Sequence, residues 1–411
     1  MIVQRVEKHL IKQNNAYYFM FCDFTHKAKN LYNHANFLVR NEFVKNNKWL
    51  RYNEIDKMLK LDVKFDDYKQ MPTAQSAQQT LRLLDKNWKS FFRTIKDWSK
   101  NKDKYLGRPK LPKYKAKYGK HILILTNQNV KLKDNILVFP KIFRGFTIQP
   151  QFIKHDNFVS FQQVRFIPNY KSFILELVYN IDVPNTILPN NKRYLSVDIG
   201  IDNLATVVNN IGLQPIIING KGLKSINKYY NKQISHYREI AKRMNNRDYT
   251  NRMNYLTMKR NCKINDYMHK ASKYLIDYAI ANDFNTIVIG NNKEWKQKSI
   301  MSKIVNQSFV GIPHMKFIEM VQYKAQNVGI NVILTEESYT SGTSFLDNEE
   351  PIKANYNKKR RIHRGLFVSN NGIKINADAN GAYQIMKKVF PNAYSNGIQG
   401  VVLHPIRVSV A

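Results

Sequence analysis

Four acidic side chains stand where predicted strands end or a predicted helix begins. Asp198 ends one predicted strand, and Glu336 and Glu337 directly follow another. Asp378 stands at the start of the last predicted helix. Because ligands of open α/β sheets gather at the carboxyl ends of the strands, we expect these acids to converge. Oxygen donors without cysteine suit two Mg²⁺ or Mn²⁺ ions, a pair that can promote phosphodiester hydrolysis.

Each acid taken alone also has an ordinary structural interpretation. Asp378 by itself is more typical of a helix N-cap, and Asp202 and Asp266 are expected to be surface or turn residues. Converging carboxylates repel one another and are costly to bury unless cations neutralise them. The spacing therefore suggests a metal site without establishing one.

The charge composition indicates a polyanionic partner. The 411 residues include 66 Lys and Arg against 30 Asp and Glu, which gives a formal net charge of +36 at pH 7. Such self-repulsion adds nothing to folding stability, and aromatic residues make up a further 12%. Cations that contact phosphates and rings that stack on unpaired bases suit a nucleic acid. A generally basic proteome is the alternative, and it would explain part of the excess.

The composition excludes several other classes of protein. A hydrophobic share of 43% and a mean hydropathy of -0.50 fit a globular protein of roughly two or three domains. No apolar run approaches the roughly 18 residues of a membrane span, and the N-terminus lacks a signal peptide's apolar block. The only cysteines, Cys22 and Cys262, are too few for a disulfide scaffold or a cysteine-rich zinc site. We expect a cytoplasmic protein without a membrane partner.

The periodicity of apolar residues predicts a multidomain protein of α+β and α/β class. Residues 1–22 begin with a strand, and residues 23–115 are mainly helical and end in an extended, cationic, proline-containing segment at 107–115. Residues 116–190 contain strand-like runs that predict a small β-barrel or sandwich, which the first strand would complete around the helical insertion. In residues 191–411, three successive strands precede alternating strands and helices, which is the ribonuclease-H-like order.

The helix predicted after Thr73 has an apolar and a polar stripe. The apolar stripe, spaced by three and four residues, is Ala74, Ala77, Leu81, Leu84, Trp88 and Phe91. The polar stripe is Gln75, Gln79, Arg82, Lys86, Lys89 and Arg93. A solvated face and a nucleic-acid-binding surface are about equally favoured for it. Further candidate nucleic-acid contacts are Arg108, Lys110, Lys113, Tyr114 and Lys115.

Four ordered motifs follow in the part of the chain after residue 190. They are LSVDIGIDNLAT at 195–206, NQSFVGIP at 306–313, ESYTSGTSFLD at 337–347 and NADANGA at 376–382. Together they resemble the TnpB family, transposon-encoded RNA-guided nucleases related to type V CRISPR effectors. The resemblance extends upstream through residues 79–92 and 107–115. It implies a RuvC nuclease domain at 191–411, with Asp198 and Asp378 as its first and last acids, after an oligonucleotide-binding-like wedge barrel with a helical recognition insertion.

The middle acid departs from the common family pattern. Most members carry a glutamate directly after the fourth RuvC strand, where this chain has Gly290. A subset has the acid moved to the strand before the Tyr-Thr-Ser segment, which favours Glu337 here. Glu336 is the close second choice, since alternation along a strand lets only one of the pair point at the metal ions, and Glu294 is a distant third.

Family members also commonly hold a four-cysteine zinc ribbon between the last two acids. The corresponding positions here are Ser344, Asp347, Val368 and Asn371. Without a thiolate we expect no zinc, and residues 338–373 or so become a cysteine-free remnant of the ribbon. A cationic cluster within it is expected either to hold a phosphate backbone or stabilise transition-state charge, or to be a charged loop. Its candidate residues are Lys358, Arg360, Arg361 and Arg364.

The resemblance implies an RNA-guided DNA endonuclease that acts as a monomer on guide RNA and double-stranded target DNA. The free energies of the DNA duplex and of the RNA–DNA heteroduplex that replaces it are nearly equal. Protein contacts to the nucleic-acid backbone would therefore favour the heteroduplex. Gln75 and Gln79 are candidates for recognising a short motif beside the target, because amides pair with adenine. A nuclease-inactive guided repressor, a compact type V CRISPR effector and a guide-independent nucleic-acid-binding protein remain alternatives.

Overall fold

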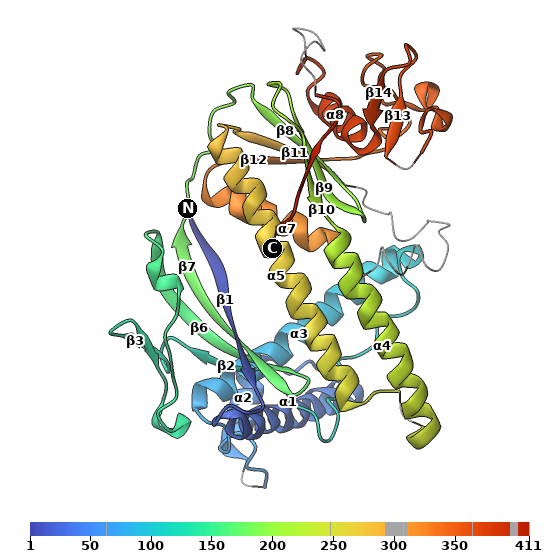
Figure 1. Ribbon diagram of the computed structural model, residues 1–411. Coiled ribbons are helices and arrows are strands. Elements are labelled where there is room, and N and C mark those ends of the chain that lie inside the picture. Colours follow the sequence, from blue (N-terminus) through green and yellow to red (C-terminus); the bar gives the residue numbers. More distant parts are fainter. Residues whose placement is uncertain are drawn as a thin grey trace. The chain divides into compact units, whose positions relative to one another are not determined.

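A computed structural model describes residues 1–62, 64–246, 248–291, 307, 311–363, 365–394 and 402–410. The chain forms two compact units, one of Ile2–Asp182 and one of Met1 with Val183–Ala411 (Figure 1). Each unit combines helices and strands, so the prediction of a multidomain, mixed α and β protein is confirmed. No helix in the described ranges has an apolar stretch long enough to cross a bilayer.

The unit of residues 2–182 is built on antiparallel strands in the order β1-β7-β6-β2. Their bounds are β1 (Ile2–Lys12), β2 (Leu123–Thr126), β6 (Phe158–Asn169) and β7 (Ser172–Asp182). A second antiparallel sheet contains β3 (Lys131–Lys133), β4 (Ile136–Val138) and β5 (Thr147–Ile148). Because β1 pairs with β7 along its whole length, the first strand does complete the β-module around the helices. Closure of these strands into a wedge barrel stays a prediction.

The helices inserted between β1 and β2 begin earlier than predicted. They are α1 (Tyr18–Asn46), α2 (Tyr52–Leu61) and α3 (Ala74–Lys100). The expected start at residue 23 is wrong, because the aromatic run after Tyr17 belongs to the helix. Phe21, fully buried, packs its ring 4.8 Å from Phe166 of the sheet. The apolar stripe of α3 is confirmed at its centre, where Ala77, Leu81, Leu84 and Trp88 are fully buried. At its two ends Ala74 is exposed and Phe91 is half-buried.

Short 3-10 turns lie between the longer elements of the chain. They are η1 (Lys102–Lys104), η2 (Lys141–Phe143), η3 (Phe152–Lys154), η4 (Lys353–Asn355) and η5 (Lys358–Arg360).

The second unit contains a mixed sheet whose described strands follow the order β12-β11-β8-β9-β10-β15. Their bounds are β8 (Tyr194–Ile199), β9 (Asn203–Asn209), β10 (Ile216–Asn219), β11 (Thr286–Gly290), β12 (Asn331–Thr335) and β15 (Ile406–Val408). β8, β9 and β10 are antiparallel, whereas β11 is parallel to β8 and to β12. The predicted strands occur in the predicted order, and β15 was not predicted.

Helices pack on both faces of this sheet. They are α5 (Asn251–Ala281), α7 (His314–Asn327) and α8 (Ala377–Val389), and α4 (Lys221–Asn245) packs along α5. One core joins the sheet to α5 and α7, and a second joins it to α8 and to the hairpin of β13 (Leu366–Val368) and β14 (Lys374–Asn376). Figure 1 shows α8 on the side of the sheet opposite α7.

A buried histidine in the unit of residues 2–182 is held in its neutral form. His121 is 8% exposed, and its ring lies 4.6 Å from the ring of Tyr32. Among the described residues, its Nε2 has no hydrogen-bond partner. Burial first, and then the positive charge of Lys115, lowers the pKa of His121 from 6.5 to about 4.

We expect His121 to make the free energy of unfolding fall as the pH drops from 6.5 towards 4. The unfolded chain takes up this proton near pH 6.5 and the folded protein only near pH 4, so the loss is about 1.4 kcal/mol per pH unit. Urea unfolding of the unmodified protein and of His121→Phe at about pH 7 and about pH 4.5 measures it. The variant is expected to lose less stability in acid, and equal losses in both proteins would contradict the assignment.

Candidate active site

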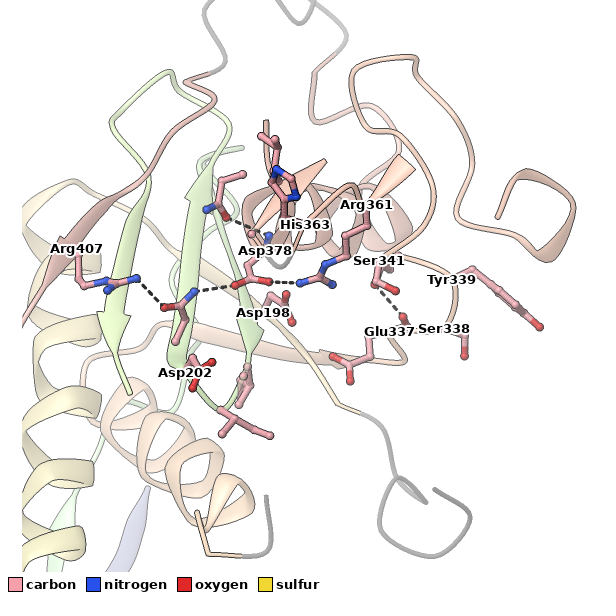
Figure 2. Close-up of a pocket in the computed structure, with 18 of the residues that line it drawn as sticks. Asp198, Asp202, Glu337, Ser338, Tyr339, Ser341, Arg361, His363, Asp378 and Arg407 are labelled. Atoms are coloured by element: carbon pink, nitrogen blue, oxygen red, sulfur yellow. Dashed lines mark hydrogen bonds and ion pairs between the residues drawn. The ribbon is translucent and has the colours of Figure 1, made fainter. Parts of the chain in front are cut away.

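Three of the predicted acids lie in one cleft of the unit that contains residues 183–411. Asp198, Glu337 and Asp378 line this cleft, which has a volume of about 1060 Å³. Figure 2 shows them around the same space, on β8, after β12 and at the start of α8. The fold therefore brings together three acids from distant parts of the sequence.

Strand alternation explains the direction of Asp198. Leu195 and Val197 pack into the core beneath α5 and α7, so Asp198 points to the opposite face, where α8 lies. Gly381 of α8 permits this approach, since a Cβ there would lie 3.1 Å from Asp198 Oδ2. The glycine of the NADANGA motif thus brings α8 against the carboxylate.

Asp378 is not the cap of its helix. Asn376 takes that role, and its Oδ1 accepts hydrogen bonds of 3.0 Å from the backbone N–H groups of Asp378 and Ala379. The Asp378 carboxylate is left to accept from Asn203 Nδ2 at 2.7 Å and from an Arg361 guanidinium nitrogen at 3.0 Å (Figure 2). The simple N-cap interpretation of Asp378 is therefore wrong.

The two glutamates after β12 lie in different environments. Glu337 lines the cleft, whereas Glu336 is exposed and accepts a hydrogen bond from the Ser338 hydroxyl. Burial raises the pKa of Glu337 to about 7. The positive charge of Lys388 acts to lower this pKa, and the negative charge of Glu336 acts to raise it. Lys388 Nζ donates to the backbone oxygens of Glu336 and Ser338 at 3.1 and 2.8 Å and so anchors the turn. Of the two glutamates, Glu337 is the one that the structure turns to the other acids.

Gly290 leaves the space that the Glu337 carboxylate occupies. A Cβ on Gly290 would lie 2.8 Å from Glu337 Oε2 and 2.7 Å from Ile385 Cδ1. Gly290 pairs with Thr335 across the parallel strands β11 and β12. An acid that follows β12 can therefore reach over the end of β11, where most TnpB sequences carry their own glutamate.

The carboxylates of the cleft lack sufficient neutralising charge. Although Asp198 keeps some solvent exposure, burial of its carboxyl raises its pKa well above the ordinary value. The negative charges of Glu337 and Asp378 raise it further, and among the described residues Arg361 is the charge that opposes them. Such a site gains stability from an added cation, and three carboxylates are the hard oxygen donors that Mg²⁺ prefers.

The cleft is nevertheless not a closed coordination shell. Within the described part of the chain, no group of three or more His, Cys, Asp or Glu side chains is arranged to hold a metal ion. Arg361 is hydrogen-bonded to Asp378, one of the candidate ligands. A bound cation would replace part of the charge that Arg361 now supplies, so the donor set fits Mg²⁺ only with a rearrangement of these side chains.

Sequence reasoning missed the groups that hold Asp378. Arg407 donates to Asn203 Oδ1 at 3.3 Å, and Asn203 in turn donates to Asp378. Asn203 lies in the quoted LSVDIGIDNLAT motif and could have been found there. Arg407 lies on β15, where apolar and polar residues alternate from Ile406 to Val410, and this strand signal was overlooked. Asp202 also lines the cleft, and Lys224 Nζ lies 2.7 Å from its Oδ1.

The predicted cationic cluster divides between different roles. Arg361 lies in the cleft together with His363, whereas Arg360 binds Glu349 at 2.7 Å. Lys358 is exposed. Arg364 and Glu294 lie outside the described residues, as do residues 306 and 308–310 of the motif at 306–313.

The polar stripe of α3 is less uniformly cationic than its sequence indicated. Lys89 forms an ion pair of 2.8 Å with Asp85, which also binds Arg51. Arg82 lies 4.4 Å from the centre of the Tyr52 ring. Gln75 and Gln79 are half-buried, and the Gln75 side-chain oxygen accepts a hydrogen bond from the Thr126 hydroxyl. Lys86 and Arg93 are exposed.

The cationic segment at 107–115 is ordered by side chains of α1. Asn36 donates to the Pro112 carbonyl at 3.0 Å, and the Asn33 amide exchanges two hydrogen bonds with the Lys115 backbone. Lys115 Nζ then lies 5.1 Å from the centre of the Tyr32 ring. Exposed on this segment are Arg108, Lys110, Lys113 and Tyr114. These groups together form a charged and aromatic surface.

Solved structures of Cas12f1 complexes are similar to this chain at low identity. One is described as "Cryo-EM structure of the Cas12f1-sgRNA-target DNA complex"; it is 16% identical, with a TM-score of 0.37, and 93% of this chain and 98% of that chain are covered. Another, "Cryo-EM structure of CRISPR-Cas12f Ternary Complex", has the same identity and TM-score and coverages of 89% and 80%. Such a TM-score does not establish a common fold. No curated protein matches the sequence.

Two family profiles match successive parts of the chain. The family OrfB_IS605, described as a probable transposase, matches residues 176–296, which include Asp198 and Gly290. The Cas12f1-like TNB domain matches residues 314–385, which include Glu337 and Asp378. A transposase and a CRISPR-effector profile in one chain is the combination that the TnpB resemblance predicts. The two matches confirm that resemblance, and the chain is TnpB-like across these residues.

Proposed function

We propose that the chain is an RNA-guided DNA endonuclease with a RuvC-type, ribonuclease-H-like nuclease domain at 191–411. The observation that carries the proposal is the meeting of Asp198, Glu337 and Asp378 in one cleft of a TnpB-like chain. The strand order β10-β9-β8-β11-β12 supports it, since three antiparallel strands followed by two parallel ones is the ribonuclease-H-like arrangement.

Asp198, Glu337 and Asp378 would hold two Mg²⁺ or Mn²⁺ ions, and no zinc is proposed. When bound, such ions activate a water molecule and stabilise the leaving oxygen of a phosphodiester. The protein's own part is to hold the three carboxylates close together. Lys388 fixes the turn that carries Glu337, while Asn203 and Arg361 each hold one oxygen of Asp378.

Arg361 has a second part in this proposal. Its guanidinium lies against Asp378 at the wall of the cleft and has further N–H donors that can bind a phosphate oxygen. A strand of nucleic acid in the cleft would therefore meet a cation beside the carboxylates that repel its phosphates. Arg361 would thus bind Asp378 and also bind and orient the scissile phosphate.

The unit of residues 2–182 is proposed to recognise the nucleic acid. Residues 1–22 and 116–190 would form the wedge barrel, and residues 23–115 the recognition insertion. Gln75 and Gln79 would read the short motif beside the target, and Lys110 and Lys113 would contact the backbone. We propose guide RNA and target DNA as partners. The net charge of +36 supports them, as do the sgRNA and target DNA in the similar Cas12f1 complex. The protein would act as a cytoplasmic monomer.

A nuclease-inactive guided repressor is the second candidate, and Gly290 is the observation that favours it. The reach of Glu337 over Gly290 argues for the nuclease, because it returns an acid to the end of β11. Incubation of the ribonucleoprotein with Mg²⁺ and target DNA separates the two candidates. Nicked or cut product supports the nuclease, and guided binding without product supports the repressor.

Asp198→Ala and Asp378→Ala are each expected to slow target cleavage by at least about 100-fold. Loss of one ligand removes several kcal/mol of transition-state stabilisation, and each 1.4 kcal/mol is a factor of ten. Guided binding is expected to persist, because base pairing with the guide recognises the target. Single-turnover cleavage and gel-shift assays measure the two properties. Normal cutting by either variant would refute the trio.

Glu337→Gln and Glu336→Gln form a matched pair that tests the middle acid. Glu337→Gln keeps the side-chain volume but removes the charge in the cleft, so we expect a loss of at least about 100-fold in cleavage. Glu336→Gln is expected to cut at close to the normal rate, because Glu336 is exposed. The reverse ranking in the same cleavage assay would assign the ligand to Glu336.

Gly290→Ala is expected to slow cleavage about tenfold or more and to lower the melting temperature. The added methyl group meets the end of the buried Ile385 side chain and the Glu337 carboxylate, so the core must yield and the carboxylate moves out of place. The double variant Gly290→Glu/Glu337→Ala is expected to cut faster than Glu337→Ala, because it returns a carboxylate to the same space. Full activity of Gly290→Ala would show that the position of Glu337 is unimportant.

A further inference from the structure

The segment between β12 and α8 carries Arg361 and His363 into the cleft with few regular elements. Residues 336–376 contain only the turns η4 and η5 and the short hairpin of β13 and β14 among the described elements. Short elements of this kind do not fix a long side chain by themselves. The hydrogen bond between Arg361 and Asp378 therefore needs support from elsewhere in the segment.

A cluster of little-exposed charges provides a fixed point directly beside Arg361. A terminal guanidinium nitrogen of Arg360 lies 2.7 and 2.8 Å from the two carboxylate oxygens of Glu349 and 3.8 Å from Asp347 Oδ2. The side chains of Arg360, Glu349 and Asp347 are only 17%, 16% and 8% exposed. Charge-assisted bonds that are shielded from water in this way are strong and directional.

Both acids of this cluster also bind the backbone. Glu349 Oε2 accepts from the Ser344 N–H at 2.8 Å, and Asp347 Oδ2 accepts from the Asn370 N–H at 2.8 Å. Arg360 thereby links the stretch 344–349, its own turn at 357–361 and the bend before β14. This is the cross-linking that a structural metal ion would supply in a segment of similar size.

The cluster is connected to the cleft through the chain itself. Arg360 and Arg361 are adjacent, and they bind different acids: Arg360 binds Glu349, and Arg361 binds Asp378 at 3.0 Å. Once the Arg360 side chain is held, the backbone at 361 has little freedom. The direction of the Arg361 side chain then follows from the geometry of the turn.

We propose that Arg360 is a positioning residue that takes the place of a structural metal ion and aims Arg361 at Asp378. Two of the positions aligned with zinc ligands, Ser344 and Asp347, belong to the same network, in which the Ser344 hydroxyl accepts from the Asp347 N–H at 3.2 Å. The catalytic consequence rests on the proposed nuclease function. The structural consequence, a metal-independent cross-link, does not.

The test compares Arg360→Ala, Arg360→Lys and Lys359→Ala in the full chain with its guide RNA. Lys359 is the matched control, because it is the exposed neighbour on the same turn. At saturating target we expect Arg360→Ala to cut at least about tenfold more slowly, with a target Kd within about twofold of the unmodified protein. Arg360→Lys keeps the charge but not the planar fork, so it is expected to restore part of the rate. Lys359→Ala is expected to cut normally.

A double-mutant cycle and hydrogen–deuterium exchange test the mechanism without relying on cleavage. Glu349→Gln and Arg360→Ala are expected to be non-additive in melting temperature, since each removes the same contact. Exchange at residues 357–363 is expected to rise in Arg360→Ala and not in Lys359→Ala. A zinc-selective chelator, TPEN, is expected to leave the melting temperature of the unmodified protein unchanged.

Several results would overturn the inference. Cleavage by Arg360→Ala as fast as by Lys359→Ala would remove the positioning role, and an equal loss of binding and cleavage would show a general folding role. Additive melting temperatures or a fall with TPEN would remove the metal-free cross-link. If the unmodified protein cuts no target, the proposed nuclease function fails, while exchange at residues 357–363 still decides whether Arg360 orders this turn.

Discussion

Mutual repulsion between carboxylates is the constraint around which the second unit is organised. Asp198, Glu337 and Asp378 face one cleft, and the pKa of Asp198 rises because burial and its two acidic neighbours disfavour its charge. A protein does not keep such an arrangement for stability, since apolar residues of similar size would pack there at lower cost. Arg361 compensates in part. The remaining negative charge favours divalent cations, and on this property the proposed phosphodiester hydrolysis depends.

The fold meets this constraint through close approach at two glycines. Gly381 lets α8 lie against Asp198, and Gly290 leaves room for Glu337 above the end of β11. Asn376 caps α8 and so releases Asp378 for the cleft. The cysteine-free segment contributes Arg361 from the turn at 357–361, where Arg360 is paired with Glu349. Each carboxylate is therefore positioned by neighbouring backbone geometry and not by its own helix or strand alone.

Strand-end acids, apolar periodicity and ordered motifs were sufficient to predict the main strands of the second unit and three of the four acids among the described residues that line the cleft. Asp202, the fourth, was expected to be a surface or turn residue. These signals were insufficient where tertiary contacts decide the outcome. Helix α1 begins at Tyr18 because its aromatic residues pack on a sheet whose other strands come more than 100 residues later. Residues 406–410 alternate apolar and polar side chains, which is a strand signal, but the contact of Arg407 with Asn203 depends on the pairing of β15 with β10. The capping role of Asn376 depends on local hydrogen bonds that spacing does not reveal.

A structure of the ribonucleoprotein with uncleavable target DNA and Mn²⁺, with the ions located by anomalous scattering, is the most direct test of this account. Convergent carboxylates beside a bound strand predict anomalous peaks within coordination distance of Asp198, Glu337 and Asp378. Peaks elsewhere, or an ordered strand in the cleft without metal ions beside these three residues, would contradict the central claim.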